Sequence, residues 1–170
     1  MSAIHGRYFQ QVHSSSSLFL LHRNIFEQKL ERLYEIRYSE EFTRRLETGN
    51  WHGCYYHCTG NCRCLEERIK THVCDDQTAI HANLWCEREK CPIQGILSHG
   101  FLTSFNIKPG HFISKQACIA SKYGIRKCHE RIFLAIFICY ARDIQRVNDG
   151  HSHVHCDEHV CPFYLAIIRV

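Results

Sequence analysis

The segment from His151 to Cys161 holds six histidine or cysteine residues among eleven positions, between two strongly apolar runs. Imidazole and thiolate are the side-chain groups that bind Zn²⁺, and burial alone does not explain so many of them in one short segment. The flanking runs, Ile132–Tyr140 and Phe163–Val170, are rich in Ile and Phe and have the length of buried strands. The pattern predicts two neighbouring core strands joined by a metal-binding connection.

The ligands of this segment are too crowded to surround one ion by themselves. Neighbouring residues cannot all point at a single centre, so two or three ligands are expected from here and the rest from elsewhere in the chain. The nearest donors in sequence are Cys128, His129 and Cys139. The candidate ligands of this site are Cys128, His155, Cys156, His159 and Cys161.

A second ligand-rich stretch runs from residue 51 to residue 64. Its Cys58-Thr-Gly-Asn-Cys62 segment has the Gly and Asn of a tight turn, and Leu65–Val73 shows the four-residue apolar spacing of a short helix. A turn followed by a helix is a common way to present zinc ligands. No C-x-x-C pair occurs in the chain, so the common ribbon and RING spacings do not apply. The candidate ligands here are Cys54, Cys58, Cys62, Cys64, Cys86 and Cys91.

Twelve cysteines are an even number, which leaves a disulfide framework open as an alternative. The first residues show no apolar core of a signal peptide, and disulfides give no reason for fourteen histidines to stand beside the cysteines. We therefore expect reduced, zinc-binding cysteines in an intracellular protein of the cytoplasm or nucleus. The longest apolar run is shorter than the roughly 18 residues of a membrane-spanning helix, so no membrane partner is expected.

The strongest helical pattern lies between Asn24 and Glu47. Asn24 and Glu27 have the spacing of a capping box, and apolar residues recur at steps of three and four. The stripe drifts around the helix, so a break near Ser39 is compatible with the pattern. Its aromatic face either packs on the core of this chain or binds the groove of a partner protein. Residues 1–23 are predicted to be a flexible segment, and 24–170 a single domain with subregions 24–91 and 111–170.

A basic stretch precedes the first apolar run. With a net charge of +4 the chain permits an acidic partner without requiring one. Basic side chains with an aromatic residue among them are compatible with binding the phosphates and bases of a nucleic acid, and also with an ordinary solvated face. The residues concerned are Lys115, Lys122, Arg126, Lys127 and Arg131.

Common enzyme signatures are missing from the chain. It has no H-E-x-x-H, no zinc-deaminase motif, no P-loop and no dinucleotide-binding glycine pattern. We expect an α+β fold, an amphipathic N-terminal helix plus a small sheet, cross-linked by one or two zinc sites. The expected function is that of a non-catalytic adaptor or regulatory protein that binds a protein or a nucleic acid, with the composition of a viral accessory protein. A zinc-dependent hydrolase or nuclease and a secreted disulfide-rich protein are the alternatives.

Overall fold

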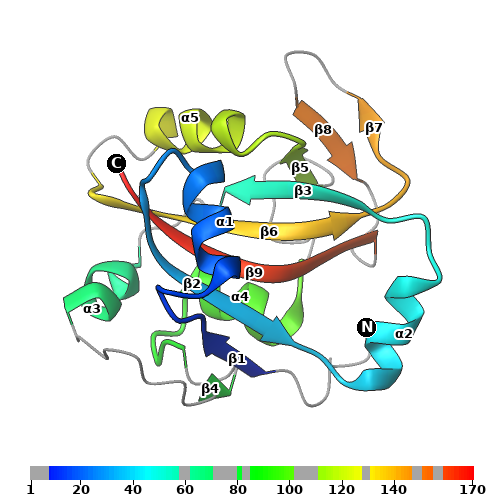
Figure 1. The fold of residues 1–170 in the computed structure, drawn as a ribbon, viewed down its shortest axis with the longest axis horizontal. Coiled ribbons are helices and arrows are strands. Elements are labelled where there is room, and N and C mark those ends of the chain that lie inside the picture. Colours follow the sequence, from blue (N-terminus) through cyan, green and yellow to red (C-terminus); the bar gives the residue numbers. More distant parts are fainter. Residues whose placement is uncertain are drawn as a thin grey trace.

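The computed structural model describes residues 8–57, 62–70, 80–81, 85–101, 111–127, 131–146, 151–154 and 159–170. Within these residues, nine strands form one sheet in which every described pair is antiparallel, with helices packed around it (Figure 1). The helices are α1 (Ser17–Ile25), α2 (Glu40–Glu47), α3 (Cys64–Lys70), α4 (Pro92–His99) and α5 (Ala117–Lys127). The strands are β1 (Tyr8–Gln11), β2 (Leu30–Arg37), β3 (His52–His57), β4 (Ile80–His81), β5 (His111–Ser114), β6 (Phe133–Ala141), β7 (Gln145–Arg146), β8 (His151–Val154) and β9 (Val160–Arg169).

Strands β6 and β9 form the centre of the sheet, whose order is β4-β1-β2-β9-β6-β3-β5-β8-β7. They pair along almost their whole length, from Phe133 opposite Arg169 to Ala141 opposite Val160. Side chains of β6 alternate between the two faces of the sheet, and both sets are buried. The prediction of two neighbouring core strands is confirmed, and their exposed residues, Tyr140 and Arg169, lie near the strand ends.

Helices cover both faces of this sheet and make three layers. Residues of α1 and α5 pack with Leu134, Ile136 and Ile138 on one face. Residues of α3 and α4 pack with Phe133, Ala135, Phe137 and Cys139 on the other face. The α+β class expected from the sequence is therefore confirmed. No helix in the described parts of the chain is long and apolar enough to cross a membrane.

The helix predicted from Asn24 to Glu47 is wrong over most of its length. Helix α1 ends at Ile25, and a tight turn follows in which Glu27 and Gln28 adopt left-handed backbone conformations, with φ of 53° and 68°. The chain then enters β2, which lies between β1 and β9. The helical residues within the predicted span are Asn24 and Ile25, at the end of α1, and the last eight residues, which form α2.

A β-bulge in β2 explains the false helical signal. The register of β2 against β9 shifts between Leu30 and Arg32, so that one residue of β2 has no partner residue on β9. The shift places Leu30 and Leu33 on the same face of the sheet, while Tyr34 and Ile36 face the other core. A three-residue step between apolar residues on one face imitates the period of an amphipathic helix.

Side-chain caps fix the starts of the two N-terminal helices. The Ser39 hydroxyl accepts a hydrogen bond from the backbone N–H of Phe42, which starts α2 at the place where the sequence showed a break. The Ser16 hydroxyl accepts one from Phe19 and starts α1 in the same way. Residues 8–23, predicted to be flexible, thus form β1 and most of α1. The short helix predicted after residue 64 is α3.

Candidate metal centre

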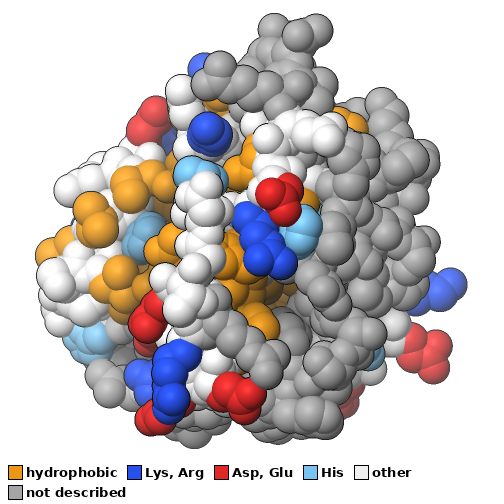
Figure 2. All heavy atoms as spheres, turned by 90° about the vertical axis from the view of Figure 1, so that its right-hand side faces the viewer, with side chains coloured by type: hydrophobic (Ala, Val, Ile, Leu, Met, Phe, Trp, Pro, Cys, Tyr) orange, Lys and Arg blue, Asp and Glu red, His pale blue; other side chains and the backbone are white. Residues whose placement is uncertain are grey.

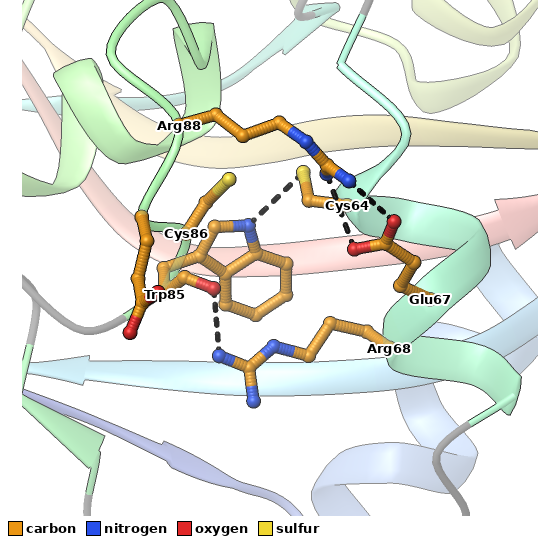
Figure 3. A pocket seen from close by; sticks show the side chains of 7 residues that line it. Cys64, Glu67, Arg68, Trp85, Cys86 and Arg88 are labelled. Atoms are coloured by element: carbon orange, nitrogen blue, oxygen red, sulfur yellow. Dashed lines mark hydrogen bonds and ion pairs between the residues drawn. The ribbon is translucent and has the colours of Figure 1, made fainter.

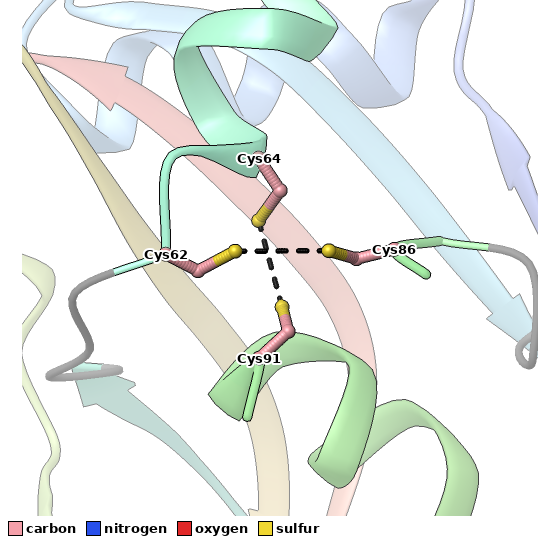
Figure 4. A group of neighbouring side chains, drawn as sticks. All are labelled: Cys62, Cys64, Cys86 and Cys91. Carbon is pink, nitrogen blue, oxygen red and sulfur yellow. Dashed lines mark hydrogen bonds between the residues drawn. The ribbon is translucent and has the colours of Figure 1, made fainter. Parts of the chain in front are cut away.

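Four cysteine thiols meet at one point beside the core. The sulfur atoms of Cys62, Cys64, Cys86 and Cys91 all lie within 4.8 Å of one another, and this group could hold a metal ion (Figure 4). Cys64 and Cys91 are buried, and Cys62 and Cys86 are partly exposed. The four side chains point inward from two segments that lie more than twenty residues apart in the sequence, 62–64 and 86–91.

Each pair of cysteines is held by the start of a helix. Cys62 lies two residues before the first residue of α3, which is Cys64. Cys91 is the N-cap of α4, where its sulfur accepts a hydrogen bond from the backbone N–H of Gln94 at 3.4 Å, and Pro92 follows at the first helical position. The Gln94 side chain in turn accepts a hydrogen bond from the backbone N–H of Cys86 at 2.9 Å. Gln94 therefore fixes Cys86 and Cys91 relative to each other.

The separations between the sulfur atoms fit a tetrahedral ion. Sγ of Cys62 lies 3.6 Å from Sγ of Cys86, and Sγ of Cys64 lies 3.6 Å from Sγ of Cys91. Four thiolates at the usual zinc–sulfur distance of about 2.3 Å stand about 3.8 Å apart at the corners of a tetrahedron. A disulfide would require about 2.05 Å. Both separations are thus close to those of tetrahedral metal ligands and longer than a disulfide bond.

Hydrogen-bond donors surround the sulfur atoms. The indole Nε1–H of Trp85 donates to Sγ of Cys64 at 3.3 Å (Figure 3). The guanidinium of Arg88 donates to Sγ of Cys62 at 3.7 Å. The same guanidinium is held by the carboxylate of Glu67, in a two-point contact whose longer bond is 3.1 Å. Donors of this kind stabilise negative charge on thiolates and orient the ligands of a metal.

Two of the four thiols, those of Cys62 and Cys91, have raised pKa values. Burial raises the pKa of Cys62, and the neighbouring thiol of Cys64 together with burial raises the pKa of Cys91 well above its usual range. Four thiolates this close together would repel one another, so a bound cation would favour their ionised form. Binding of a metal would therefore release protons from these groups.

The centre is joined to the sheet by packing and by hydrogen bonds. Trp85 packs edge-on against Tyr34 of β2, with ring centroids 5.1 Å apart, and belongs to the same core as Cys64 and Cys91. The guanidinium of Arg68 donates to the Trp85 carbonyl at 2.7 Å and lies over the indole ring. On its outer side, Cys64 and Cys86 help to line a pocket of about 510 Å³, which Figure 3 shows from close by. The centre thus lies between the core and solvent.

Other cysteines predicted as ligands lie elsewhere in the structure. Cys54 is buried on β3 opposite Cys139 of β6, inside the sheet, and Cys161 is buried on β9. Nδ1 of His159 lies 3.1 Å from the carboxylate of Asp143. Among the residues that the structure describes, His159 and Cys161 do not gather with other metal ligands. The predicted ligands Cys58, Cys128, His155 and Cys156 lie outside the described residues.

The five basic residues are spread along α5 and do not form one described surface. Lys115 precedes the helix, Lys122 is exposed on it, and Arg131 follows it, donating to the backbone carbonyl of Cys62 at 3.0 Å. The side chains of Arg126 and Lys127 are outside the described set. An eleven-residue helix is about 16 Å long, so Lys115 and Arg131 stand at opposite ends.

Trp85 and Arg88 were missed by reasoning from the sequence. Trp85 directly precedes Cys86, and Arg88 follows it by two residues. Their closeness to a cysteine in sequence was the signal that could have marked them as hydrogen-bond donors to sulfur. A comparison with models of known protein families found no match, and neither did a search of curated proteins. The geometry of the four cysteines therefore carries the functional interpretation.

Proposed function

We propose that Cys62, Cys64, Cys86 and Cys91 bind one Zn²⁺ as a structural ion, and that the chain is a non-catalytic, zinc-stabilised protein that binds a macromolecular partner. The observation that carries this proposal is the close approach of four sulfur atoms, at 3.6 Å within each opposed pair. No other protein group is needed to complete a tetrahedron. A site of this kind persists where thiols stay reduced, which supports an intracellular location.

Zinc suits this set of donors better than a hard cation. Four thiolates in tetrahedral positions are typical of zinc or of iron, whereas Mg²⁺ and Ca²⁺ prefer oxygen ligands. The indole N–H of Trp85 and the guanidinium of Arg88 donate hydrogen bonds that stabilise the negative charge of the thiolates around a divalent ion. Iron and zinc are distinguished directly, because an iron–thiolate centre absorbs visible light and a zinc centre does not.

A closed ligand set supports a structural role over a catalytic one. Catalytic zinc sites usually have three protein ligands and leave one position for water or substrate, whereas four cysteines fill all four positions. Structural zinc in small domains contributes on the order of 10 kcal/mol or more to folding. The ion would join α3 and α4 to the core that they share with β6 and β9.

Matched serine variants test the proposal. Cys64 and Cys54 are equally buried, with exposed fractions of 3% and 1%, but only Cys64 belongs to the four-sulfur group. Cys64→Ser and Cys54→Ser therefore make the same chemical change at the same depth. We expect one zinc per chain by native mass spectrometry in the wild type and in Cys54→Ser. We expect loss of the ion and a large fall in melting temperature in Cys64→Ser.

Three outcomes would contradict the proposal. One is a wild-type protein, prepared under reducing conditions with zinc present, that carries no metal. Another is equal zinc content in Cys64→Ser and the wild type. The third is a metal whose spectrum, after substitution by Co²⁺, shows fewer than four sulfur ligands, which would favour the alternative of a zinc-dependent hydrolase.

A further inference from the structure

A second pocket lies at the end of the sheet where β6 finishes and β3 begins. It has a volume of about 580 Å³ and lies away from the four cysteines. Figure 2 looks at this end of the molecule and shows basic, acidic and histidine side chains together above hydrophobic ones. The lining residues come from three separate parts of the chain and are Asn50, His52, Lys115, Arg142, Asp143 and Ile144.

Two cations line this pocket without an anionic partner among the described residues. The Arg142 guanidinium lies over the ring of Trp51, 5.1 Å from its centroid, and its buried Nε has no hydrogen-bond acceptor in the described parts of the chain. Lys115 is exposed, and no described carboxylate pairs with it. A buried, charged donor without an acceptor is unfavourable, and a bound anion would remove that cost.

Among the described residues that line the pocket, the carboxylate is that of Asp143, and it has a partner. An oxygen of Asp143 lies 3.1 Å from Nδ1 of His159, on the far side of the turn after β6. Asp143 also has a left-handed backbone, with φ of 52°, a conformation that few residues other than glycine adopt. Strained backbone of this kind is concentrated at binding and catalytic sites. Arg142 and Asp143 are adjacent in sequence, but the Asp143 carboxylate contacts His159. The guanidinium of Arg142 is therefore not paired with this carboxylate.

We propose that this pocket binds a phosphoryl group, carried by a small phosphomonoester or by the phosphodiester of a nucleic acid. The planar guanidinium of Arg142 can make two parallel hydrogen bonds to phosphate oxygens, and Lys115 adds a mobile point charge. Asn50 and His52 supply further polar groups on the same wall. The volume lies within the range of pockets for small organic ligands, so there is room for more than the phosphate itself.

This inference goes beyond the zinc proposal and does not depend on it. The pocket is built by residues near β3, β5 and β6, whereas the cysteines belong to segments around α3 and α4. Zinc content is measured on every sample used for binding. A protein that binds zinc but no phosphate would then refute this inference alone, and the reverse result would refute the zinc proposal alone.

The test is a titration of the full chain followed by ¹H–¹⁵N NMR, at about 50 mM salt. One probe is inorganic phosphate, and the other is a single-stranded oligonucleotide of about ten nucleotides. Lys115→Gln and Lys122→Gln each remove one exposed lysine charge from the same region, but only Lys115 lines the pocket. We expect saturable shifts at the pocket residues, weakened about tenfold or more by Lys115→Gln and unchanged by Lys122→Gln.

The two probes separate the two sources of phosphate. Saturable binding of inorganic phosphate alone supports a small phosphomonoester, and tighter binding of the oligonucleotide through the same residues supports a nucleic acid. Arg142→Gln is a second variant, with its fold checked by the spectrum of the free protein. Equal weakening by Lys115→Gln and Lys122→Gln would overturn the proposal, because it would show general attraction to a basic surface. Absence of shifts at the pocket residues with both probes would overturn it as well.

Discussion

Gly124 of α5 faces His57 of β3 and Leu134 of β6. A Cβ atom at this position would lie 2.6 Å from Cδ2 and 2.7 Å from Nε2 of His57, and 3.0 Å from a methyl group of Leu134. His57 is buried and packs against Tyr123, so its ring cannot move away easily. Forcing a methyl group into a packed core costs about 1–3 kcal/mol, and two contacts with one buried ring favour the upper end. Alanine recovers about 1 kcal/mol of helix propensity, which leaves a net loss of about 2 kcal/mol.

Gly95 of α4 is the matched control. It also lies inside a helix, but no atom stands within 4 Å of the position that its Cβ would take. Gly95→Ala should therefore stabilise the protein by up to about 1 kcal/mol. Urea denaturation of both variants under the same metal conditions measures the difference, expected to be about 3 kcal/mol. Equal stabilisation by Gly124→Ala and Gly95→Ala would refute the close packing of α5 on β3.

Two further predictions concern a buried histidine and a donor to sulfur. Burial lowers the pKa of His57 to about 4, so the unfolded chain takes up a proton below pH 6.5 that the folded chain does not. The free energy of unfolding should therefore fall by about 3 kcal/mol from this residue as the pH drops from about 6.5 to 4. Urea denaturation midpoints measured across that range should depend less on pH in His57→Gln than in the wild type. Trp85→Phe removes the indole N–H that donates to Cys64 while keeping an aromatic ring against Tyr34. Competition with a chelator should show zinc affinity about 10–100-fold weaker, and an unchanged affinity would rule out this role of the indole.

The parts of the fold that were predictable are those with a single, local signal. Strands β6 and β9 are apolar at nearly every position because helices cover both faces of the sheet, and this pattern is visible in the chain itself. Strand β2 was missed because its bulge places Leu30 and Leu33 on one face. Whether such spacing belongs to a helix or to a bulged strand depends on the neighbouring strand, which the local sequence does not contain.

The sequence predicted that cysteines would form the candidate metal centre, but not which of the cysteines would lie together. The pairs that meet, Cys62 with Cys86 and Cys64 with Cys91, are separated by 24 and 27 residues. Cys54 carries the same side chain and lies close to them in sequence, yet the pairing of β3 with β6 buries it beside Cys139. Tertiary structure therefore decides which thiols meet, and cysteine spacing alone left several groupings equally acceptable.

The two cysteine segments, 62–64 and 86–91, precede and follow an edge strand of the sheet in the sequence. Strand β4 (Ile80–His81) lies between them in sequence and pairs with β1 as the outermost strand on that side. A cross-link that closes a loop of about 25 residues lowers the entropy of the unfolded chain by an amount worth about 3.5 kcal/mol in the chain-entropy model. Without the proposed ion, the described contact that holds β4 is its two-residue pairing with β1, and release of β4 would leave backbone N–H and C=O groups of β1 available to another chain. Loss of the proposed ion should therefore lower the stability of the protein and also promote self-association through this strand edge.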